Sequence, residues 1–170
     1  VGGSVSGEGN VISGNLWNGV LIQSTSTGNF VKGNIIGPIA NGTTYVTGNT
    51  QTRGISIASS PNNTIGGTTP LERNIISANS TIGVYISGAN AIANVVKGNY
   101  IGINKNGTTL IASNTQDYGV FISGSAYNNF IGGSAANEGN VISGNIDKGV
   151  YLNSSSTNGN QVLGNIIGPQ

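Results

Sequence analysis

The side chains best suited to chemistry in this chain are three glutamates at a regular spacing. Glu8, Glu72 and Glu138 lie 64 and 66 residues apart (8 to 72, 72 to 138), each just before a short Asn-Val/Ile-Ile segment. Two carboxylates at a suitable separation can hydrolyse a glycosidic bond. A repeat, however, places every residue type at a regular spacing, and no second acid or base accompanies each Glu. We therefore expect no catalytic residue and interpret the chain as a protein that is not an enzyme.

Composition removes most other kinds of site. The 170 residues contain no His and no Cys, which excludes a His base, a Cys nucleophile, a thiolate zinc site and a disulfide framework. Six basic and five acidic side chains are too few for the clustered cations of a nucleic-acid interface or the converging carboxylates of a calcium site. No apolar run approaches the roughly 18 residues of a membrane-spanning helix. We expect no cofactor, no metal, no nucleic-acid partner and no membrane insertion.

The elements that position these residues form an internal repeat. The run Gly-Asn-Val-Ile-Ser-Gly-Asn at residues 9–15 recurs in close variants at 73–79 and 139–145, and the segment at 29–37 recurs at 94–102 and 160–168. One unit therefore spans about 65 residues, the distance between these copies. Within it, a Gly-apolar-x-apolar tetrapeptide recurs in steps of 35, 29, 36 and 30 residues, opening at Gly19, Gly54, Gly83, Gly119 and Gly149.

Each step contains three short apolar segments whose residues alternate with the period of two that is typical of strands. Three strands per step, repeated, predict an all-β solenoid: a three-sided parallel β-helix of about five to six coils, forming one domain over residues 1–170. Equivalent residues then stack about 4.8 Å apart. Four inward ladders are expected, beginning at Val20, Ile22, Val31 and Ile12, and nearly all their members are β-branched.

Asparagine recurs at two corners of each coil. A side-chain amide can donate to the coil on one side and accept from the coil on the other, so these residues predict hydrogen-bonded ladders that stabilise the stack. Repeated amides could instead bind sugar or ice, and we favour the structural interpretation. The first ladder comprises Asn29, Asn63, Asn94, Asn129 and Asn160, and the second comprises Asn34, Asn74, Asn99, Asn140 and Asn165, which follow Asn10.

The outward positions of the first strand suggest a contact surface. They are occupied by Leu21, Ser56, Tyr85, Phe121 and Tyr151, of which four are apolar or aromatic. Aromatic side chains on a flat sheet face are suited to stacking on sugars or docking a protein. Stacking between neighbouring strands, or a loop folded over them, would explain the same residue types. Leu21, Tyr85, Phe121 and Tyr151 are therefore the candidate contact residues.

The repeat motifs resemble a known family. The runs Asn-Asn-Thr-Ile-Gly-Gly-Thr at 62–68, Arg-Asn-Ile-Ile-Ser-Ala-Asn at 73–79 and Gly-Asn-Tyr-Ile-Gly at 98–102 resemble the right-handed parallel β-helix repeats of large secreted or surface-displayed microbial proteins. The wider pectate-lyase-like superfamily includes polysaccharide lyases, epimerases, tailspikes and adhesins. Its enzymes carry clustered Asp with Lys, Arg or His, and no position here matches such a cluster. The resemblance implies an extracellular or cell-surface location.

Function follows from the resemblance rather than from the periodicity. The leading hypothesis is a non-catalytic structural or adhesive module, a section of a stalk or a filament-forming subunit. The repeat runs in mid-motif to Val1 and Gln170, so we expect a section of a longer array or a fibre subunit. Its partners are then other copies of itself or continuing repeats, and surface glycans. The alternatives are a carbohydrate-binding module that uses the aromatic strip, and a non-catalytic part of a polysaccharide lyase or epimerase.

Overall fold

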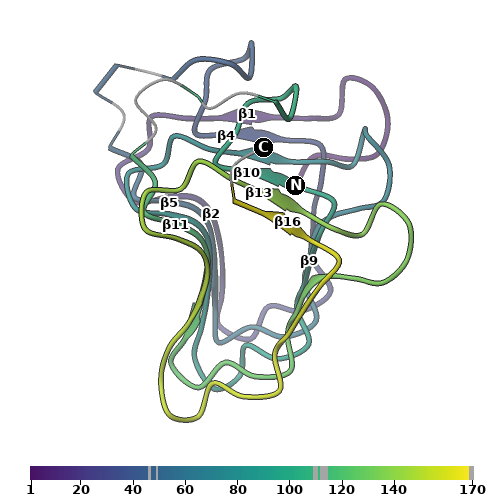
Figure 1. Cartoon of the computed structure of the whole chain (residues 1–170), viewed down its shortest axis with the longest axis vertical. Helices are drawn as coiled ribbons and strands as arrows, with labels where there is room; N and C mark the ends of the chain where they lie inside the picture. The colour runs from purple at the N-terminus through teal and green to yellow at the C-terminus, as the bar shows by residue number, and fades with distance from the viewer. Residues whose placement is uncertain (46, 49, 109–110, 112–114, 169–170) are drawn as a thin grey trace.

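Short parallel strands stacked in three sheets make up the fold. The structure, a computed structural model, describes residues 1–45, 47–48, 50–108, 111 and 115–168. Each strand pairs with the strand three positions earlier and three positions later in the chain, so the chain completes one coil for every three strands. Figure 1 shows the β1 sheet across the top and the other two sheets converging below it. The predicted three-sided parallel β-helix is confirmed.

The three sheets are named here by their first strands. The β1 sheet contains β1 (Val11–Ile12), β4 (Ile35–Ile36), β7 (Ile75–Ile76), β10 (Tyr100–Ile101), β13 (Val141–Ile142) and β16 (Ile166–Ile167). The β2 sheet contains β2 (Asn18–Gln23), β5 (Arg53–Ala58), β8 (Ile82–Ser87), β11 (Tyr118–Ser123) and β14 (Lys148–Leu152). The β3 sheet contains β3 (Phe30–Val31), β6 (Thr64–Gly66), β9 (Val95–Lys97), β12 (Phe130–Gly132) and β15 (Gln161–Leu163).

All four predicted inward ladders are confirmed by the strand register. Val84, for example, pairs with Ile55 on one side and with Val120 on the other. In the inner coils these side chains are fully buried, because each coil covers the apolar face of the one before it. Branching at Cβ suits such columns, since a stiff side chain on a pleated strand fits closely against its equivalents above and below.

The last coil leaves the same ladders uncovered. Ile142 is fully buried, but its neighbour Ile167 in the last coil is 49% exposed. In the other two sheets, Val162 and Leu152 of the last coil are 37% and 40% exposed, while their partners one coil earlier are fully buried. The apolar interior therefore opens at the last coil, whereas Val20, Ile22 and Val31 of the first coil are buried.

Alternate coils differ by one residue where the β2 sheet begins. The N–H groups of Thr81 and Ile82 both donate to the carbonyl of Thr52, at 3.0 and 3.1 Å, so two residues oppose one as in a β-bulge. Asp147 and Lys148 repeat the pattern two coils later with the carbonyl of Asp117. The described residues form no helix that is long and apolar enough to cross a membrane.

Candidate functional site

The two predicted asparagine ladders run through the corners on either side of the β3 sheet. In each, the Nδ2 of one Asn donates to the Oδ1 of its equivalent in the next coil, at 2.8 to 3.1 Å. The same Oδ1 also accepts the backbone N–H of the preceding Asn, as Asn74 Oδ1 does from Asn34. The inner members, such as Asn94 and Asn99, are fully buried. The buried amides are therefore engaged in scaffolding.

A third amide ladder, which sequence reasoning missed, lies at the corner that leads into the β2 sheet. It alternates Asn with Gln: each amide nitrogen donates to the amide oxygen of the next coil at 2.7 to 3.0 Å, in the order Asn15, Gln51, Asn79, Gln116 and Asn145. The bulge explains the alternation, because the Asn coils have one residue more between the amide and the following Gly. The longer Gln side chain occurs in the coils that lack this residue.

The recurrent glutamates are turn caps and ion-pair partners. Lys32 Nζ is 2.7 Å from Glu72 Oε1, and Lys97 Nζ is 3.0 Å from Glu138 Oε1. The other oxygen of Glu72 accepts the backbone N–H of Thr68 at 3.1 Å. The hydrogen bond from Lys32 lowers the pKa of Glu72 to about 2, and the hydrogen bond from Lys97 lowers the pKa of Glu138. These Glu side chains hold their coils to the preceding ones.

The ion pair of Glu72 makes the stability of the folded chain depend on pH. Glu72 has its pKa lowered in the folded chain from 4.5 to about 2, so its contribution is present above pH 4.5 and is lost as the pH falls toward 2. We expect the melting temperature to fall across this range. In Glu72→Gln, whose amide oxygen still accepts the turn N–H groups, we expect a shallower fall. Thermal melts at several pH values measure both, and parallel curves would contradict the role of Glu72.

Aromatic side chains gather on the outer face of the β2 sheet. The ring centroids of Tyr85 and Phe121 are 5.3 Å apart, and those of Phe121 and Tyr151 are 4.8 Å apart with nearly parallel planes. Tyr118, which sequence reasoning missed, joins them at 5.4 Å from Phe121 and 5.5 Å from Tyr151. We call these four residues the aromatic cluster. Tyr118 lies one residue before a repeated Gly, and Arg53 and Lys148 occupy the same position in other coils.

Much of the ring surface in the aromatic cluster is already in contact. Parallel rings with centroids 4.8 Å apart overlap, so each covers part of the other's face. The guanidinium of Arg53 lies 4.6 Å from the centre of the Tyr85 ring, and Lys148 Nζ lies 5.0 Å from that of Tyr151. Each cation thus covers a ring at one end of the column. Packing between coils accounts for these residue types, and sugar stacking remains a prediction.

The predicted strip is not continuous. Leu21 is 46% exposed, but Ser56, the next residue of the strip, is only 2% exposed. Its short side chain lies between the larger Leu21 and Tyr85 on the flanking strands. The expectation that Ser56 lines the exposed face is therefore wrong, and Leu21 is separated from the three aromatic candidates.

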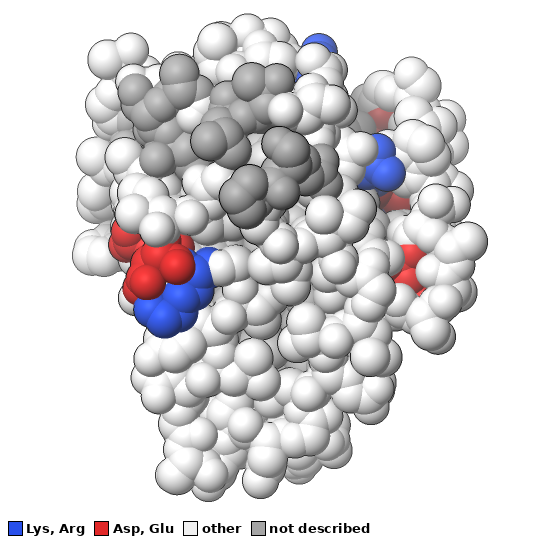
Figure 2. All heavy atoms as spheres, in the orientation of Figure 1, with Lys and Arg blue, Asp and Glu red and all other residues white. Residues whose placement is uncertain are grey.

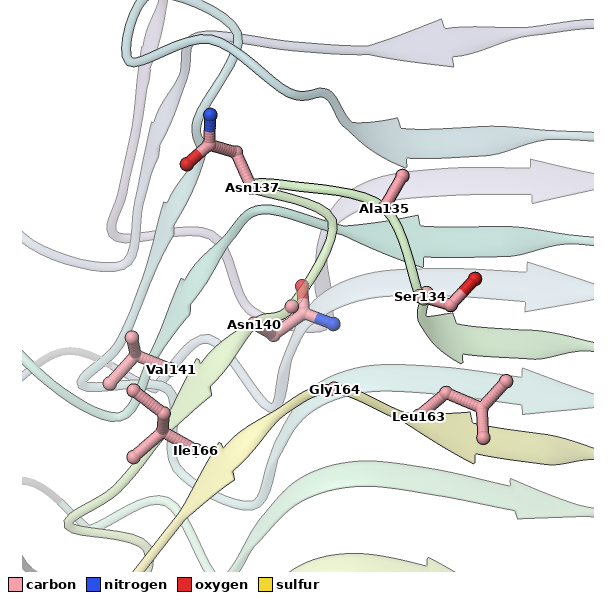
Figure 3. Close-up of a pocket in the computed structure, with 10 residues that line it drawn as sticks. Ser134, Ala135, Asn137, Asn140, Val141, Leu163, Gly164 and Ile166 are labelled. Atoms are coloured by element: carbon pink, nitrogen blue, oxygen red, sulfur yellow. The ribbon is translucent and has the colours of Figure 1, made fainter.

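The last coil contains an open groove beside the turn at residues 134–138. In Figure 3, Val141 and Ile166 lie on neighbouring strands, and the turn that carries Ser134 arches away from them. We call this depression the end groove. The residues that line it offer no acid or base, only apolar side chains, one hydroxyl, amides and backbone groups: Gly133, Ser134, Ala135, Asn137, Gly139, Asn140, Val141, Leu163, Gly164 and Ile166.

Charged side chains are few, with six basic and five acidic residues among the 170. Figure 2 shows charged side chains only in small groups, separated by broad uncharged areas. Within the described part of the chain, no three acidic, His or Cys side chains gather where a metal ion could bind.

Comparisons with protein-family models, with curated proteins and with solved structures found no match to this chain.

Proposed function

We propose that this chain is a non-catalytic structural or adhesive module of an extracellular or cell-surface β-helix, a stalk or filament section whose copies stack end to end. The observation that carries the proposal is the exposure of the core at the last coil. Ile167 is 49% exposed where its equivalent Ile142, one coil inside, is fully buried. An uncovered parallel sheet also presents unpaired strand edges, for which an equivalent coil is the natural partner.

The contacts of the acidic side chains support a structural role. Glu72 and Glu138 are held by lysines and by turn N–H groups, and Glu8 accepts the backbone N–H of Val5 at 3.0 Å. Asp147 pairs with Lys148 beside it. A general acid must carry a proton and a general base must bind one readily, and the lowered pKa of the two Lys-bound carboxylates disfavours both roles.

The proposal predicts self-association through the end coils. We expect the purified chain to form elongated oligomers as its concentration rises, measured by light scattering after size exclusion and by electron microscopy. Ile167→Lys places a charge on the end coil and is expected to abolish assembly. Phe130→Lys is the matched control, because Phe130 is 37% exposed on β12, which has a paired strand on each side. A monodisperse monomer at high concentration would contradict stacking.

A further inference from the structure

We propose that Tyr118 and Tyr151 form a site of oxidative modification, at which a peroxide-derived one-electron oxidant joins their two phenol rings into a dityrosine cross-link. Tyr118 lies on β11 and Tyr151 on the neighbouring strand β14. The cross-link fastens two adjacent coils to each other by a covalent bond. This inference goes beyond the proposed function and does not depend on it.

The first observation is the placement of the two rings. Tyr118 pairs in register with Lys148, so Tyr151 lies three residues further along the neighbouring strand. The ring centroids of the two tyrosines are 5.5 Å apart, and the ring planes are tilted by 32°. Because β11 has a paired strand on each side, the contact is built into the stack and is independent of what lies beyond β14.

Neighbouring side chains hold the two rings in place. The Phe121 ring lies 5.4 Å from that of Tyr118 and 4.8 Å from that of Tyr151. Lys148 Nζ lies 5.4 Å from the centre of the Tyr118 ring and 5.0 Å from that of Tyr151, and a cation at such distances is attracted to a ring. The two phenols are therefore brought together before any oxidation, which favours their reaction with each other.

The second observation is that this contact between tyrosines is unique in the described part of the chain. No other two tyrosine rings among the described residues are in contact. Tyr85 belongs to the same aromatic cluster, but its ring contacts that of Phe121, and its hydroxyl shares a hydrogen bond with Ser123 Oγ at 2.9 Å. A phenylalanine ring has no phenol hydrogen to lose, so Phe121 gives Tyr85 no partner for coupling.

The third observation is a composition that offers few other side chains to an oxidant. Thiols and thioethers are readily oxidised in proteins, and this chain has no Cys and no Met. Its one tryptophan, Trp17, directly precedes β2, which is three strands away from β11 in the same sheet. A radical formed in the aromatic cluster therefore has the neighbouring tyrosine as its nearest partner.

The reaction balances with a peroxide as the oxidant. Each phenol gives up one electron and its hydroxyl proton, which leaves two tyrosyl radicals. A ring carbon next to the C–O carbon of one tyrosine then bonds to the equivalent carbon of the other. The C–H bonds at these two carbons break, and their protons return to the two phenol oxygens. The pair thus loses two electrons and two protons, which reduce one hydrogen peroxide to two waters. Both tyrosines are partly exposed, so the protons pass to solvent.

Oxidation of the purified chain by hydrogen peroxide with a haem peroxidase tests the proposal. The protein is kept dilute and the monomer is isolated afterwards, so that links between copies are analysed separately. We expect the monomer to acquire dityrosine fluorescence and to lose the mass of two hydrogens. Trypsin cleaves after Lys105 and Lys148, so the cross-link should join peptide 106–148 to peptide 149–170. The melting temperature should rise, because the bond closes a loop in the unfolded chain.

Tyrosine-to-phenylalanine variants identify the reacting pair, because they remove a phenol and keep the ring. We expect Tyr118→Phe and Tyr151→Phe each to lower the dityrosine yield of the monomer by about tenfold or more, since each removes one member of the positioned pair. Tyr85→Phe is the matched control, which removes a phenol from the same cluster and should leave the yield unchanged. Tyr127 shares a tryptic peptide with Tyr118, and the Tyr118→Phe variant distinguishes the two. Circular dichroism verifies that each variant is folded.

Three outcomes would overturn the proposal. The first is an equal yield of dityrosine from Tyr118→Phe and from the unmodified chain. The second is a main product that links another pair of tyrosines or that links separate copies. The third is a monomer without dityrosine under conditions in which N-acetyltyrosine amide in the same solution is coupled.

Discussion

Replacing Ile86 with aspartate is expected to unfold the coil that contains it and its neighbours. Ile86 is fully buried and pairs in register with Ile57 and Ile122. An aspartate there would place a carboxylate among isoleucines with no partner, which costs about 4 kcal/mol or more. Because each coil is stabilised mainly by its neighbours, damage in the middle of the stack spreads in both directions.

Circular dichroism and urea denaturation would measure this effect. Ser87→Asp is the matched control, because it adds the same charge one residue along, on the partly exposed outer side of β8. We expect the control to change the free energy of unfolding by about 0.5 kcal/mol or less, as for other surface substitutions. An unchanged melting temperature for Ile86→Asp would contradict the inward orientation of this ladder.

Replacing Asn99 with alanine is expected to have the second largest effect. Its Oδ1 accepts the side-chain and backbone N–H groups of Asn74, and its Nδ2 donates to Asn140 Oδ1 and to the carbonyls of Ile65 and Lys97. Alanine leaves these groups without their partner in a fully buried corner. At about 1–3 kcal/mol for each unsatisfied group, with partial relaxation, we expect a loss of about 3–5 kcal/mol.

The control for Asn99→Ala is Asn90→Ala, which removes an exposed asparagine from a turn. We expect the control to change stability by about 0.5 kcal/mol or less in the same urea titration. Similar losses for the two variants would show that the ladder amide contributes no more than an ordinary surface residue.

The inward ladders were predictable because each member lies at a constant distance from a repeated Gly or Asn. The third amide ladder could not be predicted in this way. It alternates Asn with Gln, and the two residue types lie at different distances from the following Gly. The ion pairs were missed for another reason. Lys32 and Glu72 lie 40 residues apart, and their meeting depends on which coil follows which at that corner.

In the candidate contact surface, the repeat pattern predicted the strand register but neither the burial of each side chain nor the contacts between rings. The register of Tyr85, Phe121 and Tyr151 followed from the repeat, but the burial of Ser56 depends on the sizes of its two cross-strand neighbours. Tyr118 lies in a column whose residue types have nothing in common: Asn18, Arg53, Ile82, Tyr118 and Lys148. Its contact with the aromatic cluster depends on ring positions, which the repeat does not determine.

All three amide ladders point the same way along the axis, since the amide-to-amide bonds of each ladder run from the nitrogen of one coil to the oxygen of the coil that follows. Backbone dipoles in a sheet largely cancel, whereas these side-chain dipoles add and polarise one another. The rod therefore has an electric polarity, with amide oxygens at the Asn10 end and amide hydrogens at the Asn165 end. In the end-to-end stacking proposed above, the two ends of an assembly would therefore present different charges to an incoming copy.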